Sequence, residues 1–284
     1  MSSTGAATQA IDIPKRDLKF DIDGVDLRSW HPEGLHVSHF FNALSIFFPE
    51  GETFFIDAVR HYKDRIRSPK LQQELTGFLG QEAMHSREHR RYNAALKAAG
   101  LPVVELEKKV LAHLDQVRAT APQIEQLSAT IALEHFTAIM ADVLLTDDTH
   151  LGGADPRMAA IWRWHAIEET EHKAVAFDVF EEVAGKGFAA YARRTLVMLF
   201  TTVDFWIRVA NYHYRLVKAD GGAGDLRGWW SVFRFLWIKP GGMWRMWRNW
   251  ASYFRPGFHP WQHDNVAHVE RWKKAYAAAG QAPA

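Results

Sequence analysis

After about residue 33, apolar side chains recur three and four positions apart in a series of long segments. This spacing matches the period of an amphipathic helix, and no segment shows the strict alternation of a half-buried strand. Proline and glycine residues separate the segments, among them Pro49, Pro69, Gly100 and Pro156. The pattern predicts an all-α protein.

The apolar segments predict seven helices before the C-terminal region. Their ranges are 35–48, 51–66, 69–100, 102–120, 121–148, 155–185 and 188–220. We expect three parts: a polar, partly extended arm of residues 1–33, a helical bundle of residues 34–218, and a C-terminal extension of further helices, residues 219–284, packed on the bundle.

Two of the predicted helices carry the same charged motif. Glu82 and His85 stand three apart in "QEAMH", and Glu169 and His172 repeat that spacing in "EETEH". At this spacing both side chains of a pair lie on one helix face. Between the motifs, Glu134 interrupts the apolar run "IALEHFTAIMADVLL", where an isolated carboxylate would be costly to bury.

A further glutamate precedes the first motif. Glu52 lies in the aromatic stretch "FFPEGETFFIDAV". Glu50 is an alternative ligand, because Pro49 leaves the phase of the helix undetermined at this point. We favour Glu52. The resulting order is Glu, Glu-x-x-His, Glu, Glu-x-x-His on four helices, which is typical of a carboxylate-bridged dinuclear metal site. One Glu-x-x-His alone would more often be a solvated helix face.

Neighbouring histidines extend the predicted site. His165 precedes Glu169 by four residues, and from about 100° per residue the two project with His172 within roughly 60°. His165 is therefore a third ligand from this helix or a hydrogen-bond donor to one. His89 follows His85 by one turn and stays outside the predicted ligands. The predicted metal and catalytic residues are Glu52, Glu82, His85, Glu134, His165, Glu169 and His172.

Three aspartates could orient the ligand histidines, although each has an ordinary surface or helix-pairing interpretation. They are Asp142, Asp178 and Asp204.

Composition narrows the function classes. The chain has 284 residues, a net charge of +1 and no cysteine, so disulfides and thiolate chemistry are excluded and nucleic acid is not an expected partner. The N-terminal residues lack the apolar run of a secretory signal. A cytoplasmic location, peripheral to the inner membrane at most, is expected.

Tryptophan and arginine dominate the C-terminal region. Eight of the 12 tryptophans lie from Trp229 to Trp272, and residues 226–263 contain six Arg or Lys and no acidic residue. This composition suits contact with anionic lipid, and it also suits a helical cap whose rings pack on the bundle. We favour the cap, which is compatible with lipid contact. His259 and His263 here are further candidates for substrate contact.

Several phrases carry a resemblance to known families. With "FPEGE", "QEAMH", "HAIEETEH" and "RPGFHPWQHD", residues 35 to about 265 resemble the bacterial family labelled predicted metal-dependent hydrolase. The ligand order is similar to that of the ferritin-like di-iron superfamily. The spacing of His165, Glu169 and His172 resembles that of the arylamine N-oxygenases, in which an extra histidine ligates one iron. This resemblance implies oxygen activation at a di-iron or iron/manganese centre, with two metal ions per chain.

These features predict an oxygenase or oxidase that activates O2 to oxidise a hydrophobic small molecule. It would need an external electron donor, because no Gly-rich flavin or nicotinamide motif occurs. A homodimer is compatible with the sequence. The main alternative is a hydrolase in which two metals activate water. An iron-storage protein and a membrane-interaction protein with a vestigial site are further alternatives.

Overall fold

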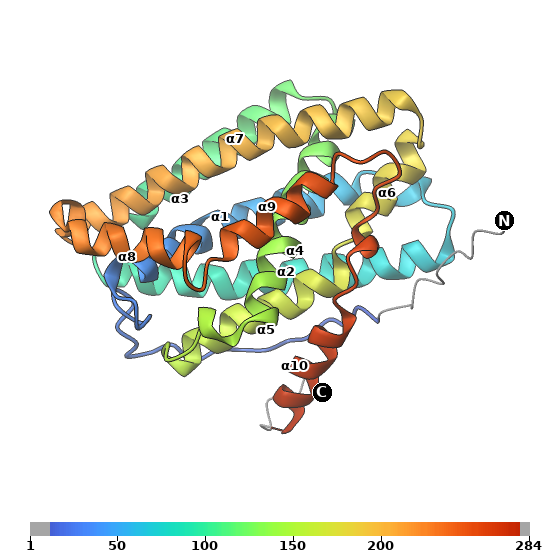
Figure 1. Cartoon of the computed structure of the whole chain (residues 1–284). Helices are drawn as coiled ribbons and strands as arrows, with labels where there is room; N and C mark the ends of the chain where they lie inside the picture. The colour runs from blue at the N-terminus through green and yellow to red at the C-terminus, as the bar shows by residue number, and fades with distance from the viewer. Residues whose placement is uncertain (1–11, 279–284) are drawn as a thin grey trace.

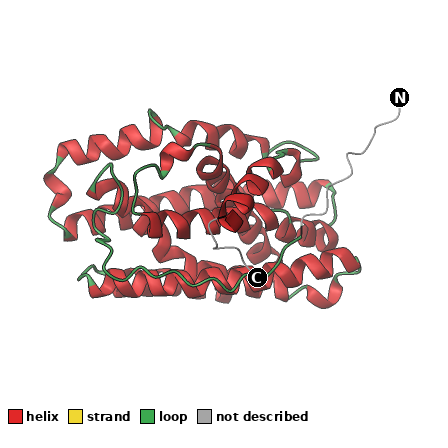
Figure 2. Cartoon of the chain, turned by 90° about the horizontal axis from the view of Figure 1, so that it is seen from below, coloured by secondary structure: helices red, strands yellow, loops and turns green. Residues whose placement is uncertain are grey.

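The computed structural model describes residues 12–278, and every regular element in that range is a helix (Figures 1 and 2). This confirms the all-α prediction. Residues 1–11 and 279–284, the ends of the predicted arm and extension, lie outside the described residues. The division into arm, bundle and extension remains a prediction.

Ten α-helices and four short 3-10 helices follow one another along the described chain. The α-helices are α1 Leu35–Arg60, α2 Pro69–Ala98, α3 Val103–Thr120, α4 Gln123–Thr146, α5 Pro156–His172, α6 Val175–Ala184, α7 Phe188–Ala219, α8 Leu226–Trp237, α9 Gly242–Ser252 and α10 Val266–Ala278. The 3-10 helices are η1 Lys63–Arg65, η2 Asp148–His150, η3 Gly222–Gly224 and η4 Pro260–Gln262.

Helices α1, α2, α4 and α5 pack against one another as the core of the bundle (Figure 1). Helix α7 covers α1 and α4, and α3 packs on α1. The C-terminal helices return over this core: α8 contacts α1, α9 contacts α4, and α10 contacts α5 and α4. The four core helices are those expected to supply metal ligands.

Helix α1 runs without interruption through Pro49, so the predicted separation into 35–48 and 51–66 is wrong. Proline has no N–H to donate to the carbonyl of Ser45 one turn earlier. The side-chain amide of Asn93 on α2 donates to that carbonyl instead, at 3.2 Å. The lost helical hydrogen bond is thus replaced from a neighbouring helix, and Glu52 keeps the helix phase of the residues before the proline.

The predicted helix 155–185 divides into α5 and α6 at Lys173 and Ala174, directly after the second Glu-x-x-His motif. The Lys173 amine is buried and donates to the carbonyl of His263 and to the Asn265 side chain, both at 2.7 Å. Contacts with the segment before α10 therefore hold the turn in place. They fix the position where the ligand-bearing helix ends.

Helix α4, among the described helices, is the one long and apolar enough to cross a membrane. In its most apolar stretch, 72% of the residues are buried within the protein. Its apolar character is explained by its central place in the bundle.

Candidate metal centre

The four core helices bring all seven predicted residues into one buried cluster. Helix α1 supplies Glu52, α2 supplies Glu82 and His85, and α4 supplies Glu134. Helix α5 supplies the remaining three residues, His165, Glu169 and His172. Each of the seven residues is at most 4% exposed. Donor atoms lie within 4.8 Å of one another in three overlapping groups: Glu52, His85 and His165; Glu82, His85 and Glu169; and Glu82, Glu134 and His172.

Two carboxylates occupy the middle of the cluster. One oxygen of Glu169 lies 3.5 Å from Nδ1 of His85, and the other lies 3.5 Å from Nε2 of His172. The oxygens of Glu82 approach the same two nitrogens at 3.9 and 3.2 Å. Glu82 and Glu169 each therefore face two histidines, as expected for carboxylates between two adjacent cations.

The other two carboxylates lie on opposite sides of this middle pair. Glu52 lies 3.8 Å from Nε2 of His165, and Glu134 lies 3.6 Å from Nε2 of His172. His165 also contacts Glu169 at 2.8 Å. Each side thus has one outer glutamate and one histidine of its own, besides its share of the middle carboxylates.

The donor atoms of the cluster are poorly satisfied by the protein itself. Eight of the fifteen buried side-chain nitrogen and oxygen atoms without a hydrogen-bond partner, within residues 12–278, belong to these residues. They include both oxygens of Glu82 and of Glu134, Nδ1 of His85 and Nε2 of His172. Buried polar groups are normally paired. The residues therefore fit a metal-binding role, because cations would satisfy these atoms together.

The carboxylates carry an electrostatic cost. Burial, and after it the charge of Glu82, raises the pKa of both Glu52 and Glu134 well above the usual range. Burial also raises the pKa of Glu82. In the protein alone these groups favour their protonated form. Bound cations would reverse this preference, because they stabilise the carboxylate form.

The histidines divide into two kinds. Burial would lower the pKa of His85 and His172, but the carboxylates beside them raise it well above the usual range. Those histidines in turn overcome the effect of burial at Glu169 and hold its pKa well below the usual range. Burial and the nearby His85 lower the pKa of His165 to about 4, so its ring is neutral, as a metal ligand must be.

A second layer of side chains orients two of the ligand candidates. His85 uses its other ring nitrogen, Nε2, to contact Glu168 at 3.0 Å. His172 uses Nδ1 to contact the Gln81 side-chain oxygen at 3.0 Å. When these nitrogens carry the protons, the free lone pairs of both rings point into the cluster, an arrangement that metal-binding histidines commonly use.

The N-terminal arm holds this second layer. Arg16 donates to Glu168 at 3.0 Å and to both oxygens of Glu171 at 2.6 and 2.7 Å. Gln81 donates to Glu171 and to the carbonyl of Pro14. The sequence analysis did not find Arg16 or Gln81. Arg16 lies in a polar segment without periodicity, and Gln81 differs from an ordinary helix-surface glutamine only in its partners.

The residues left open in the sequence now have definite places. His89 lies behind His165, with its Nε2 2.7 Å from Nδ1 of that ring, and Ser45 contacts its other nitrogen. It therefore supports a ligand candidate and is outside the three donor groups. Glu50 is partly exposed and pairs with Arg90 at 3.6 Å.

The three aspartates pair elsewhere. Asp142 and Asp178 contact His263 and His259, at 3.1 and 2.8 Å. Asp204 contacts His113 and Arg208. The idea that these aspartates orient ligand histidines is therefore wrong.

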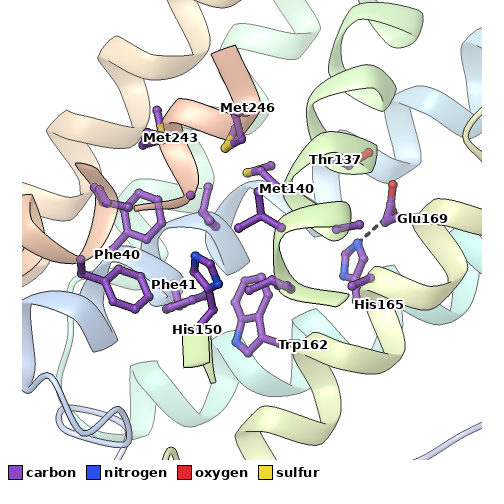
Figure 3. A pocket seen from close by; sticks show the side chains of 18 of the residues that line it. Phe40, Phe41, Thr137, Met140, His150, Trp162, His165, Glu169, Met243 and Met246 are labelled. Carbon is purple, nitrogen blue, oxygen red and sulfur yellow. Dashed lines mark hydrogen bonds and ion pairs between the residues drawn. The ribbon is translucent and has the colours of Figure 1, made fainter. Parts of the chain in front are cut away.

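An apolar cavity of about 70 Å³ reaches the cluster at His165 and Glu169. Figure 3 shows these two residues at one end and Phe40 at the other. The wall also contains His150, whose buried Nε2 has no hydrogen-bond partner among the described residues. Nδ1 of His150 lies 3.2 Å from the carbonyl of Asp147 and so carries the proton. Its Nε2 is therefore a free acceptor on a residue that lines an apolar space.

A larger apolar cavity of about 270 Å³ reaches the cluster from another side, at Glu52. Residues of α1, α3, α4 and α7 line it, and its walls include Phe48 and Thr137, which also line the smaller cavity. Two apolar spaces therefore meet the same polar centre and share part of their walls.

Comparison with known proteins identifies a family for this chain. A family model described as "Predicted metal-dependent hydrolase" matches residues 14–264, which include all seven ligand candidates and Arg16. No curated protein and no solved structure matches the chain. The family description contradicts the predicted oxygenase and agrees with the hydrolase alternative. The physical reason for the error is that glutamate and histidine accept iron, manganese and zinc alike, so the ligand pattern does not select the reaction.

Proposed function

The chain belongs to the family of predicted metal-dependent hydrolases, and from this we propose that it hydrolyses an apolar substrate at two metal ions held by the buried cluster. The observation that carries the proposal is the set of eight unpartnered donor atoms, arranged around two carboxylates that each face two histidines. The residue types leave the metal open among zinc, manganese and iron.

Glu82 and Glu169 would hold the ions from the middle of the cluster. Glu52, His85 and His165 would complete one side, and Glu134 and His172 the other. Bound divalent ions supply Lewis acidity and lower the pKa of water, which provides a nucleophile at neutral pH.

The protein contributes the orientation of the metal ligands. Glu168 and Gln81 hold the outer ring nitrogens of His85 and His172, which fixes the lone pairs that face the centre. Glu52 lines the larger cavity, and its Oε1 has no hydrogen-bond partner in the described chain, while Ser86 donates to Oε2 at 2.9 Å. Oε1 is therefore the oxygen that Glu52 would offer to a metal ion.

The cavities indicate the substrate. Both are apolar and both end at the cluster, so an ester or amide with an apolar group on each side of the scissile bond would place that bond at the centre. His150 adds one polar requirement, because its unpartnered Nε2 can accept a hydrogen bond from the substrate. We expect a hydroxyl or amide donor at that position.

Metal analysis tests the proposal directly. The purified protein should carry about two divalent ions per chain after loading with zinc, manganese or anaerobic iron. Glu169→Ala should lose them, and the partly exposed Glu50→Ala on α1 should keep them. Absence of metal from the wild-type protein after all three loadings would refute the proposal.

Hydrolysis is the second measurement. The loaded protein should cleave p-nitrophenyl esters faster as the acyl chain lengthens from acetate to decanoate, and it should do so equally well without oxygen. The Glu169→Ala variant should fall by at least about 100-fold, beyond the range of an outer-layer partner. A rate that is unchanged in this variant, or one that needs oxygen, would contradict the hydrolase.

A further inference from the structure

Helix α7 exposes a stripe of apolar side chains on its outer face. Leu196, Leu199, Phe200, Val203 and Ile207 follow at intervals of one to four residues and are 46–76% exposed. The opposite face of the same helix buries residues such as Met198 and Val209 in the bundle. The helix is thus apolar on both sides, although only one side has a partner within the described chain.

Helices α8 and α9 continue this exposed surface. Trp230 and Phe233 on α8, and Trp244 and Trp247 on α9, are 47–62% exposed. Trp247 stacks on Trp250 with ring centres 4.7 Å apart, and the indole N–H of Trp250 donates to Thr202 on α7 at 2.9 Å. Figure 1 shows α8 and α9 returning alongside α7. We call these exposed residues of α7, α8 and α9 the aromatic face.

Positive charge is interleaved with the aromatic rings. Arg227, Lys239, Arg245, Arg248 and Arg255 are exposed on or between these helices, and residues 226–263 contain no acidic side chain. On α9, Arg248 follows Trp244 by four residues and therefore projects from the same side of the helix. The surface is apolar and cationic together.

We propose that the aromatic face binds the surface of an anionic lipid bilayer. Tryptophan is favoured at the boundary between headgroups and acyl chains, and arginine is attracted to anionic headgroups. The contact would be peripheral, because the helix with the length and apolarity of a membrane span, α4, is largely buried in the bundle. A second copy of the chain is a poorer occupant, since pairing α8 and α9 with themselves would place like charges together.

The other sides of these helices face the candidate metal centre. Phe235, Met243 and Met246 of α8 and α9 line the smaller cavity, and Phe205 of α7 lines the larger one. A substrate leaving the bilayer at the aromatic face would have one layer of helices to pass. This route rests on the proposed hydrolase function, whereas lipid binding itself does not.

Vesicle flotation tests the binding without any substrate. The full chain should float with phosphatidylglycerol vesicles and bind phosphatidylcholine vesicles at least about fivefold more weakly. The double substitution Trp244→Ser and Trp247→Ser should reduce binding to both kinds of vesicle by more than about tenfold, because it removes two apolar side chains that insert among the lipids. Neither residue lines a cavity, so the interior should be unaffected. Arg248→Glu should remove most of the preference for anionic lipid, and Arg90→Glu on α2 should leave it unchanged.

Separate readouts keep the interpretation clear. Metal content and melting temperature of the tryptophan variant should match the wild type, so a binding defect would not reflect misfolding. Failure to float with either vesicle would overturn the proposal, as would equal flotation of the wild type and the tryptophan variant. A wild-type dimer in sedimentation velocity that the two substitutions dissociate, without vesicle binding, would assign the face to a second copy. Loss of hydrolysis by Glu169→Ala with intact flotation would leave lipid binding established independently of the enzyme activity.

Discussion

The candidate metal centre and the aromatic face depart from the usual distribution of residues in opposite ways. The centre buries four glutamates and three histidines that normally remain near solvent, and the aromatic face exposes side chains that normally fill a core. The buried cluster is surrounded by fixed partners such as Arg16, Gln81 and Glu168. The exposed rings have few such partners beyond one another.

This difference indicates the size of what each region binds. Donor atoms that converge within a few ångströms, and that are held by a second layer, match small ions. A broad surface without convergent groups matches an extended partner. The predictions below test this contrast, in order of decreasing expected effect.

Replacing Glu134 by leucine should separate metal binding from stability. Both carboxylate oxygens lack hydrogen bonds within the described chain, so their removal should stabilise the metal-free protein by about 1–3 kcal/mol. Metal affinity should nevertheless fall by at least about 100-fold. Isothermal titration with zinc and thermal unfolding measure the two effects. Gln123→Leu, at the exposed start of the same helix, is the control and should change neither. A destabilised metal-free Glu134→Leu protein would contradict the interpretation.

His213 should show that a histidine buried without carboxylates behaves differently from His85 and His172. Burial lowers the pKa of His213 to about 4, against about 6.5 in an unfolded chain. Between these values the unfolded state binds a proton that the native state does not. Stability should therefore fall as the pH drops from about 6.5 to about 4, by up to about 3 kcal/mol.

Urea unfolding over this pH range measures the effect. His213→Gln should have a shallower pH dependence, because glutamine does not titrate. The exposed His61→Gln should keep the wild-type slope, and identical slopes for His213→Gln and the wild type would refute the assignment.

Removing the outer partner of His172 should weaken the metal site without abolishing it. Gln81→Met deletes the acceptor that lies 3.0 Å from Nδ1 of His172, and such partners are worth about ten- to a hundredfold in metal affinity. Competition with a fluorescent zinc chelator measures the loss. Gln72→Met on the same helix, far from the cluster, is the matched control, and equal affinities of the two variants would argue against an orienting role.

The smallest effect on the fold is expected at the aromatic face. Val203→Ser changes an exposed side chain and should alter the free energy of unfolding by no more than about 0.5 kcal/mol. Metal content should also stay constant, while flotation with anionic vesicles should weaken. Chemical denaturation and vesicle flotation of the same sample measure the two effects. A clear loss of stability would contradict the prediction and would mean that Val203 contributes to the core.

Helical periodicity was sufficient to predict α2, α3, α4 and α7, and motif spacing to predict the seven clustered residues. Spacing within one helix is a local property, so the Glu-x-x-His pairs and His165 could be placed without knowing the tertiary structure. The continuity of α1 could not, because Asn93 replaces the hydrogen bond lost at Pro49 only after α2 has packed. Gln81 and Arg16 were missed for the same reason, since their roles depend on partners 90 or more residues away.

The reaction was predicted incorrectly although the residues were placed together as expected. Four glutamates and three histidines describe a charge and a set of donor atoms, and both oxygen activation and hydrolysis can use them. The two reactions differ in the metal that is bound and in the access of oxygen, water and substrate to it. This access depends on the cavities. The apolar walls of those cavities come from seven different α-helices, and their meeting point at Phe48 and Thr137 has no signature in the sequence.

The contact between the arm and the second layer has a consequence for the order of assembly. Arg16 is synthesised long before Glu168 and Glu171, which follow 152 and 155 residues later. The partners of the arm come together only when α2 and α5 are in place, so the arm docks after these helices although it is synthesised before them. We therefore expect metal ions to enter more readily before the arm docks, because Arg16 does not yet cover Glu168 and Glu171.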